Sequence, residues 1–199
     1  MREIQDMLRE RGIDMTQEQR EKLEREVSGT SMYYSCYFVK QWMGLSDTVS
    51  ELIQENEQKT QTYYPQCLRY IHGFVDFHDH VSSYELMTAL ATNSHRDKLQ
   101  QFDRKLGLRK FFGDHMYCVD DVQGVSKPQP NIYQYTANQL GITPQESIVI
   151  EDSYPGIWAA RKAGAYSIGL VTGNNRNNVL HADYIAEGYG QIDLQKVLY

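Results

Sequence analysis

The chain has 199 residues, of which 41% are hydrophobic, so it can bury the core of one domain with room for a small inserted one. Its formal net charge of −6 argues against nucleic acid as a partner, because a polyphosphate backbone requires a basic surface. No apolar run approaches the roughly 20 residues of a membrane-spanning helix, and the N-terminus is too charged for a secretory signal. Together with three unpatterned cysteines, these features predict a cytoplasmic protein with no membrane partner.

Residues 1–64 have the periodicity of helices and contain no signal of a buried strand. A first helix is expected to end near Gly12, and Asp14 or Thr16 can cap the second. The aromatic residues of 31–43 favour a strand, whereas the helical spacing of other hydrophobic residues favours a helix. We predict a helix there, and therefore an entirely helical N-terminal domain.

A further helix, capped by Ser46 or Asp47, is expected to continue toward Tyr63. From there the pattern changes to apolar runs of strand length that alternate with helices, which predicts an α/β domain over 65–199. Strands are predicted at residues 86–92, 116–119, 147–151 and 166–171, with a weaker one at 182–185.

The first of these strands ends in the polar run Thr92-Asn93-Ser94. The Thr92 hydroxyl at a strand end could hydrogen-bond an anion. The backbone N–H groups of Asn93 and Ser94 could add donors at the start of the following helix, where the helix dipole favours negative charge. A threonine in this place is also a common helix N-cap, which is the simpler alternative.

The segment from 126 to 165 places a lysine, a helix, a strand and two carboxylates close together in the sequence. Pro130 suits the first turn of a helix, Gly141 suits its left-handed end, and 143–146 resembles a capping box. An apolar strand follows. A second helix is expected to begin at Pro155-Gly156 and to stop at Gly164.

Glu151 and Asp152 stand directly after that apolar strand. Carboxylates at the carboxyl end of a buried parallel strand face the crevice where α/β sheets bind ligands, and adjacent carboxylates suit a hard cation such as Mg²⁺. The alternative is an acidic turn that only caps the next helix.

The order of these features resembles the third and fourth motifs of the haloacid dehalogenase-like hydrolase superfamily. It runs Lys127-Pro128, a helix, an apolar strand ending in Glu151-Asp152, and Ser-x-x-Gly-Ile-x-Ala-Ala-x-x-Ala-Gly. The pattern is most similar to the phosphatases and β-phosphoglucomutase relatives that carry a helical cap. The resemblance implies a Rossmann-like parallel sheet with helices on both faces over 65–199, preceded by a helical cap over 1–64. It also implies Mg²⁺ and a small phosphorylated metabolite as substrate.

The resemblance assigns roles to individual residues. Lys127 and Thr92 would act as catalytic groups and would bind the phosphoryl group with Asn93 and Ser94. Asp152, helped by Glu151, would hold Mg²⁺. A turn in the cap would border the substrate, although an ordinary turn between helices is an equally good interpretation; its residues are Gly29, Thr30 and Ser31.

One motif of the superfamily is absent from this sequence. An apolar strand ending in Asp-x-Asp-Gly-Thr would supply the nucleophilic aspartate, yet no two aspartates here are separated by a single residue. The chain begins where the cap would begin, as though that strand had been removed ahead of Met1. We therefore expect an inactive hydrolase of phosphatase or phosphomutase type. The alternatives are a non-catalytic phosphate-binding or regulatory relative, or a structural, oligomer-forming remnant.

The missing strand also matters for the sheet. In the resembling fold it lies between the strand that ends at Thr92 and the strand that ends at Asp152, and buried strand edges need partners. We expect these two strands to pair directly, or a second copy in a homodimer to contribute a strand. Insertion of residues 31–39 ranks lower because of their helical pattern.

Overall fold

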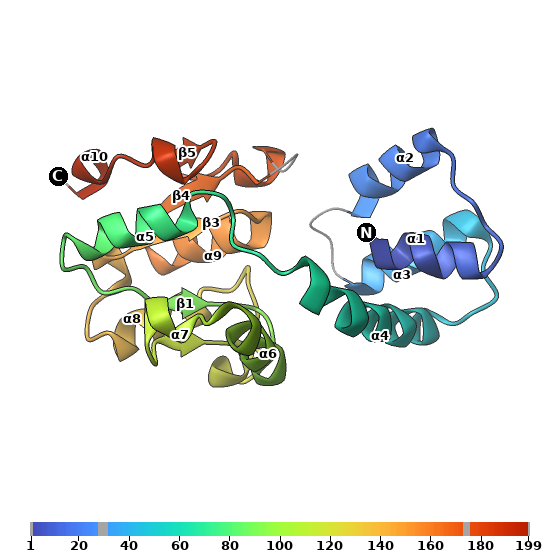
Figure 1. Ribbon diagram of the computed structural model, residues 1–199, viewed down its shortest axis with the longest axis horizontal. Helices are drawn as coiled ribbons and strands as arrows, with labels where there is room; N and C mark the ends of the chain where they lie inside the picture. The colour runs from blue at the N-terminus through green and yellow to red at the C-terminus, as the bar shows by residue number, and fades with distance from the viewer. Residues whose placement is uncertain (1, 28–31, 173–175, 199) are drawn as a thin grey trace. The chain divides into compact units, whose positions relative to one another are not determined.

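The computed structural model describes residues 2–27, 32–172 and 176–198. The chain separates into two compact units, Met1–Leu68 and Arg69–Tyr199, which are described in turn (Figure 1). None of the helices in the described residues combines the length and the hydrophobicity that crossing a membrane requires.

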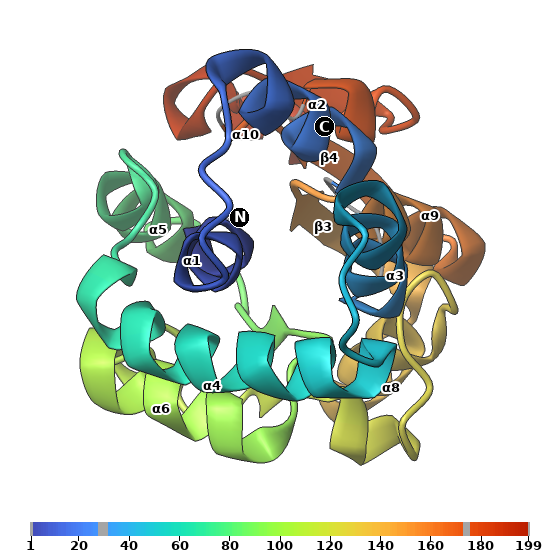
Figure 2. The ribbon, with the colours of Figure 1, turned by 90° about the vertical axis from the view of Figure 1, so that its right-hand side faces the viewer.

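The described part of the first unit is helical, as its periodicity predicts. Helix α4 packs against both α1 and α3, while α2 contacts α3 (Figure 2). The helices are α1 (Arg2–Glu10), α2 (Gln17–Val27), α3 (Met32–Met43) and α4 (Val49–Cys67). They bury two hydrophobic clusters: one contains Ile4, Leu8, Met15, Leu23, Val27 and Val39, and the other contains Met7, Cys36 and Leu52.

The starts of α2 and α4 are set by capping boxes, one of them at a residue other than the predicted one. Thr16 caps α2: its hydroxyl accepts the Gln19 N–H at 3.2 Å, and the Gln19 side chain accepts the Thr16 N–H at 2.8 Å. Neither Ser46 nor Asp47 caps α4. Thr48 does so through Glu51, because the Asp47 carboxylate is instead paired with Arg11 at 2.6 Å.

The second unit is an α/β domain whose strands all pair in parallel, which confirms the predicted fold class. One sheet has the order β1-β2 and the other β3-β4-β5. The strands are β1 (Leu90–Ala91), β2 (Met116–Tyr117), β3 (Ile148–Glu151), β4 (Tyr166–Leu170) and β5 (Tyr184–Ala186). The helices are α5 (Phe74–Ser82), α6 (Arg96–Leu106), α7 (Arg109–Phe112), α8 (Asn131–Gln139), α9 (Tyr154–Ala163) and α10 (Leu194–Leu198). Short 3₁₀ turns are η1 (Val119–Val122), η2 (Pro144–Glu146), η3 (Arg176–Val179) and η4 (Tyr189–Gln191).

Helices cover both faces of the strands. On one face, α8 and α9 supply Ile132, Tyr133, Ala159, Ala160 and Ala163, against which Ala91 and Val149 pack. The other face is covered by α5 and α10, and its cluster contains Val81, Ile168, Leu170, Ala186, Ile192 and Leu194. This two-sided covering explains why the strands read as continuous apolar runs.

Strands β3 and β4 are each one residue shorter than predicted, and β1 and β2 are shorter by two residues or more, because a strand exists only where a neighbour pairs with it. The run 86–92 contributes only Leu90–Ala91, which pair with Met116–Tyr117. The predicted strand 116–119 ends early because the chain turns into η1, where the Asp121 carboxylate accepts the Cys118 N–H at 2.8 Å.

The expectation that the strands ending at Thr92 and Asp152 pair directly is wrong, because β1 and β3 lie in separate sheets. Insertion of residues 31–39 does not occur either in the described residues, since 32–39 belong to α3. The edges of β1 and β3 that point away from β2 and β4 therefore have no strand partner within the described ranges.

Candidate functional site

Lys127 joins the carboxyl ends of two strands. Its ammonium Nζ donates a hydrogen bond of 3.0 Å to the carbonyl oxygen of Ala91, the last residue of β1. The same Nζ forms an ion pair with Glu151, the last residue of β3, and the two side chains are only 6% and 10% exposed. A buried lysine at this position is expected to be paired, because an isolated buried charge is very costly.

The Glu151 carboxylate has both oxygens occupied by donors. Oε1 accepts the Tyr133 hydroxyl at 2.7 Å in addition to Lys127, while Oε2 accepts the Ser153 hydroxyl at 2.9 Å. The backbone N–H groups of Asp152 and Ser153 reach Oε2 at 3.2 and 3.3 Å. Burial alone would raise the pKa of Glu151, but the Lys127 charge and the hydrogen bonds outweigh it and hold the pKa below the ordinary 4.5. Glu151 is therefore ionised at neutral pH.

Tyr133 completes this buried cluster. Its ring centroid lies 4.8 Å from the Lys127 Nζ, a cation–π distance. Burial and the adjacent Glu151 carboxylate raise the pKa of the Tyr133 phenol well above its ordinary value. Its hydroxyl thus remains a hydrogen-bond donor to Glu151 at physiological pH.

The start of α9 is shaped around Glu151. Ser153 is the N-cap, and its hydroxyl accepts the Gly156 N–H at 3.2 Å while donating to Glu151. A Cβ atom at Gly156 would stand 2.0 Å from the Cδ of Glu151, so only glycine allows this close approach. The predicted stop at Gly164 is confirmed by its left-handed φ of 89°.

The polar run after β1 fixes the backbone of Lys127. The Asn93 side chain accepts the Lys127 N–H at 2.9 Å and donates to the Lys127 carbonyl at 3.5 Å. The Thr92 hydroxyl accepts the Ser94 N–H at 3.1 Å, so the Ser94 amide already has an acceptor within the protein. Thr92, Asn93, Lys127 and Glu151 are thus brought to one place, although Thr92 and Lys127 are 35 positions apart in the sequence.

The N-terminus of α6, where anion-binding donors were predicted, already has a carboxylate. Helix α6 begins at Arg96, after the predicted donors Asn93 and Ser94, and its first N–H donates to Asp120 at 2.7 Å. Asp120 also contacts His95 at 2.7 Å. The helix end is therefore capped by the chain itself, and the Thr92 hydroxyl proton is a donor at the end of β1.

Asp152 lies beside the Lys127 cluster but differs from Glu151 in being exposed. Its Oδ2 accepts the Thr172 hydroxyl at 2.9 Å, so residues that follow β3 and β4 meet here. Within the described residues, no group of three His, Cys, Asp or Glu side chains could hold a metal ion. Mg²⁺ needs oxygen ligands in a near-octahedral arrangement. The Glu151 carboxylate is already paired with Lys127, so Asp152 is the carboxylate of the two that is left for a metal ion. These residues alone do not form a magnesium site.

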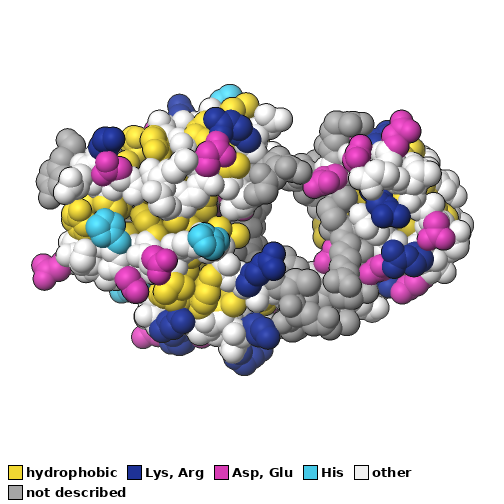
Figure 3. All heavy atoms as spheres, turned by 45° about the horizontal axis from the view of Figure 1, so that its top comes forward, with side chains coloured by type: hydrophobic (Ala, Val, Ile, Leu, Met, Phe, Trp, Pro, Cys, Tyr) yellow, Lys and Arg dark blue, Asp and Glu magenta, His cyan; other side chains and the backbone are white. Residues whose placement is uncertain are grey.

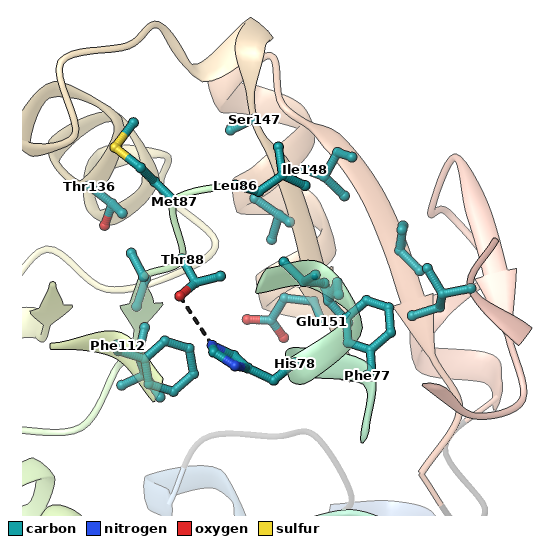
Figure 4. A pocket seen from close by; sticks show the side chains of 18 of the residues that line it. Phe77, His78, Leu86, Met87, Thr88, Phe112, Thr136, Ser147, Ile148 and Glu151 are labelled. Carbon is teal, nitrogen blue, oxygen red and sulfur yellow. Dashed lines mark hydrogen bonds between the residues drawn. The ribbon is translucent and has the colours of Figure 1, made fainter. Parts of the chain in front are cut away.

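A cavity of about 540 Å³ lies between β1 and β3 and reaches Ala91 and Glu151 at one end. Figure 4 shows Glu151 at this cavity, with Phe77, Ile148 and the hydrogen-bonded pair of His78 and Thr88 around it. His78 Nε2 lies 3.2 Å from the Thr88 hydroxyl oxygen, and that hydroxyl donates to the Phe111 carbonyl at 3.0 Å. The cavity is otherwise lined mainly by hydrophobic side chains.

The sequence did not indicate Tyr133 and Ser153 as parts of the site. Tyr133 reads as one more apolar residue on a helix face, and Ser153 as an ordinary cap. The Ser-x-x-Gly spacing was the available signal for Ser153, since it places a hydroxyl and a glycine one helical turn apart. The substrate turn predicted at Gly29, Thr30 and Ser31 lies outside the described residues.

The sequence profile of the haloacid dehalogenase-like hydrolases matches residues 39–164 of the chain. The phosphorylated carbohydrates phosphatase of Thermotoga maritima is 27% identical over 161 residues, which are 80% of this chain and 74% of that protein. The phosphoglycolate phosphatase of Escherichia coli K12 is 43% identical over 90 residues, 45% of this chain and 35% of that protein.

Among solved structures, a HAD family hydrolase from Deinococcus radiodurans R1, crystallised with phosphate and sodium, superposes with a TM-score of 0.81. The superposition covers 99% of this chain and 87% of that one, at 22% identity. At this identity the likeness concerns the fold.

Proposed function

The chain belongs to the haloacid dehalogenase-like hydrolase family, and on that premise we propose that it binds the phosphoryl group of a small phosphorylated metabolite at Thr92 and Lys127. The observation that carries the proposal is the position of Lys127, whose ammonium reaches the carboxyl ends of both β1 and β3. Ligands of α/β domains bind at this edge of the strands. The phosphatase activities of the relatives support a phosphate monoester as the ligand class.

Each residue would contribute differently to phosphate binding. Thr92 would donate its hydroxyl proton, because its oxygen already accepts the Ser94 amide. Lys127 has three N–H donors, of which two go to Glu151 and Ala91, so the third would go to the phosphoryl oxygen. Asn93 would hold Lys127 in place rather than touch the ligand. Since the Lys127–Glu151 pair has no net charge, binding would rely on directed hydrogen bonds.

The proposed chemistry of these 199 residues stops at binding. Hydrolysis by covalent catalysis needs a nucleophile, and no Asp-x-Asp pair occurs in the 199 residues. The carboxylate of Glu151 is held as a counter-ion. Among the functions that the sequence analysis left open, this favours a phosphate-binding or regulatory relative for these 199 residues acting alone.

Asp152 is the residue through which this chain would contact Mg²⁺, because its exposed carboxylate stands at the same strand edge. One carboxylate with a neighbouring hydroxyl gives an incomplete ligand set, so we expect weak binding. Glu151, also predicted as a ligand, would take part only after giving up its bond to Lys127.

The remaining parts of the proposal rest on the sequence. The helical unit would serve as a substrate cap, with Gly29, Thr30 and Ser31 near the substrate. A cytoplasmic location, a homodimer and the domain boundary at 64/65 also stay predictions.

Binding of inorganic phosphate, measured by calorimetry, tests the proposal with two matched variants. Thr92→Val removes the proposed donor at nearly constant volume and should weaken binding roughly tenfold to a hundredfold, the range for a hydrogen bond to a charged group. Thr136→Val removes a hydroxyl that bonds the Ile132 carbonyl within α8 and should leave binding unchanged. Equal affinity of wild type and Thr92→Val would contradict the proposed site.

Turnover is tested with an aryl phosphate in the presence of Mg²⁺. We expect no phosphate release above buffer, since groups that act together with a nucleophile lose nearly all their effect without it. Release that Asp152→Ala abolishes would show that the chain is an active phosphatase and would overturn the expectation of inactivity.

A further inference from the structure

Lys127 by itself is a poorly directed hydrogen-bond donor. An ammonium group has three N–H donors on a flexible four-carbon stem and turns them toward any acceptor within reach. Figure 3 shows lysine and arginine side chains of the second unit that stand out from the surface, where water supplies acceptors. The Lys127 side chain is buried instead, so the protein around it decides where its protons point.

Two of the three Lys127 protons have acceptors within the protein. One goes to the carbonyl oxygen of Ala91 at 3.0 Å, and another goes to Oε1 of Glu151. The backbone of Lys127 is held as well, because its N–H donates to the Asn93 side chain at 2.9 Å. The third proton is the one that the proposed phosphate site uses, and its direction depends on the other acceptors that it can reach.

Glu151 itself competes for that third proton. A carboxylate has about four lone-pair sites and can take two protons from one ammonium group. Oε2 is filled from the start of α9, by the Ser153 hydroxyl at 2.9 Å and by the backbone N–H groups of Asp152 and Ser153 at 3.2 and 3.3 Å. Oε1, which already binds Lys127, is therefore the oxygen that could accept a second Lys127 proton.

Tyr133 occupies this remaining site on Glu151. Its hydroxyl donates to Oε1 at 2.7 Å, so Oε1 accepts one hydrogen bond from the phenol and one from Lys127. Together with the donors on Oε2, the carboxylate then has as many donors as its lone pairs can serve. The third Lys127 proton finds no second place on Glu151.

The Tyr133 ring covers another side of the ammonium group. Its centroid lies 4.8 Å from the Lys127 Nζ, so an aromatic face, and not water, stands there. An aromatic face attracts an N–H group, but much more weakly than an anionic oxygen does. A phosphoryl oxygen that enters beside Thr92 would therefore take this proton without displacing a hydrogen bond of the protein.

Helix α8 holds Tyr133 in place. Tyr133 and Ile132 are buried in one hydrophobic cluster with the alanines of α9. The Tyr133 N–H also donates to the Pro130 carbonyl at 3.0 Å, in the first turn of the helix. A tyrosine side chain has only two torsion angles, so a ring packed in this way leaves its hydroxyl little freedom.

We propose that Tyr133 is a positioning residue of the phosphate site: its hydroxyl fills the second lone pair of Glu151 Oε1 and so leaves the third proton of Lys127 to the phosphoryl oxygen. This inference rests on the proposed binding of phosphate at Thr92 and Lys127. It adds that Tyr133 acts through Lys127 and does not touch the ligand.

The phosphate affinity of Tyr133→Phe, measured by calorimetry on the full chain, tests the proposal. The substitution keeps the ring beside Lys127 and removes the hydroxyl, so Oε1 becomes free to accept a second Lys127 proton. Binding of inorganic phosphate should weaken about tenfold, which corresponds to the loss of one hydrogen bond to a charged group. Tyr184→Phe is the matched control: it removes a hydroxyl that donates to the Gln191 carbonyl at 2.9 Å and should leave the affinity unchanged.

Ser153→Ala separates positioning from support of the fold. Ser153 also donates its hydroxyl to Glu151, but to Oε2, and it caps α9. Its loss should lower the thermal stability at least as much as Tyr133→Phe does, because the cap is lost too, yet weaken phosphate binding less. If Tyr133 were merely structural, the affinity would follow the stability, and Ser153→Ala would bind phosphate no better than Tyr133→Phe.

The NMR signal of the Lys127 ammonium group reports its direction. In protein made with isotope-labelled lysine, the Lys127 nitrogen resonance is assigned by its absence from Lys127→Met. Addition of phosphate should shift this resonance in the wild type. The shift should be much smaller in Tyr133→Phe, in which Glu151 holds the third proton.

The phosphate site and the role of Tyr133 fail in different ways. If the wild type binds phosphate and Tyr133→Phe binds it equally well with the same Lys127 shift, Tyr133 has no positioning role, while the phosphate site stands. If the wild type does not bind phosphate and the Lys127 resonance does not move, the phosphate site is wrong and the role of Tyr133 is overturned with it.

Discussion

At the scale of single residues, the candidate site is organised by one buried ion pair. Lys127 and Glu151 are almost fully enclosed, and each holds neighbours in place: Lys127 the carboxyl end of β1, Glu151 the start of α9. A buried pair is held more firmly than a surface pair, because neither charge can be left without the other. We therefore expect the pair to determine stability as well as phosphate binding.

Lys127→Met should destabilise the second unit by about 3–5 kcal/mol, because it leaves a buried carboxylate without its counter-charge. The double variant Lys127→Met with Glu151→Gln should recover part of this loss, since no buried charge then remains. Lys196→Met is the matched control: the Lys196–Asp193 pair is 82% and 48% exposed and should contribute at most about 1 kcal/mol. Urea unfolding measures all three. A similar loss for Lys127→Met and Lys196→Met would show that the buried pair is not special.

The lowered pKa of Glu151 predicts a pH dependence. A carboxylate whose pKa is lower in the folded state contributes stability that is complete above its unfolded pKa, near the ordinary 4.5, and is lost as pH falls through the folded value. The stability difference between wild type and Glu151→Gln should therefore be greatest at neutral pH and shrink on acidification below about 4.5. Urea titrations at a series of pH values check this. A difference that stays constant into the acid range would mean that Glu151 gains nothing from its partners.

At the scale of elements, the turn between β3 and α9 is the most tightly fitted part of the site. Ser153 acts at once as helix cap and as donor to Glu151, and Gly156 leaves room for the carboxylate. The sequence Ser-x-x-Gly therefore has a packing reason in addition to helix initiation.

Gly156→Ala should destabilise the protein by about 2–3 kcal/mol, the upper part of the range for overpacking, because its Cβ would meet the Glu151 Cδ at 2.0 Å. Gly188→Ala should have little effect, since nothing lies within 4 Å of a Cβ there and its φ of 174° is extended. Thermal unfolding of the two variants compares them directly. If both melted at the wild-type temperature, Glu151 would have to move without cost, and the described cluster would not be rigid.

At the scale of the whole molecule, the division of the strands into two sheets sets the distribution of local stability within the second unit. Strand β4 is paired on both sides, so its amides should exchange most slowly. In β3, the amides of Val149 and Glu151, which face β4, should be protected, whereas those of Ile148 and Ile150 should not. Residue-resolved exchange by NMR measures this alternation. Uniform protection along β3 would contradict an open edge.

The sequence by itself determined the fold class and the positions of most elements. Alternating apolar runs and helical periodicity predicted a parallel α/β domain, and local chemistry at Thr16, Thr143 and Gly164 set helix ends, because caps and left-handed glycines act over a few neighbouring residues. The strand-end residues Thr92 and Glu151 could also be identified, since polar residues after apolar strands lie at one edge of a parallel sheet. Lys127 follows no strand, and the family resemblance is what indicates it.

Only the tertiary structure decided what these residues do to one another. Glu151 and Asp152 are adjacent in sequence, yet one is buried against Lys127 and Tyr133 and the other is exposed beside Thr172. The burial of each carboxylate and the side chains that it contacts depend on α8 and on the loop that follows β4. No local sequence pattern specifies these contacts. The family resemblance suggests direct pairing of β1 with β3 as one way to close the gap left by the missing strand. This pairing does not occur, because strand pairing is decided by which backbone edges meet in space, and not by the residues of one strand.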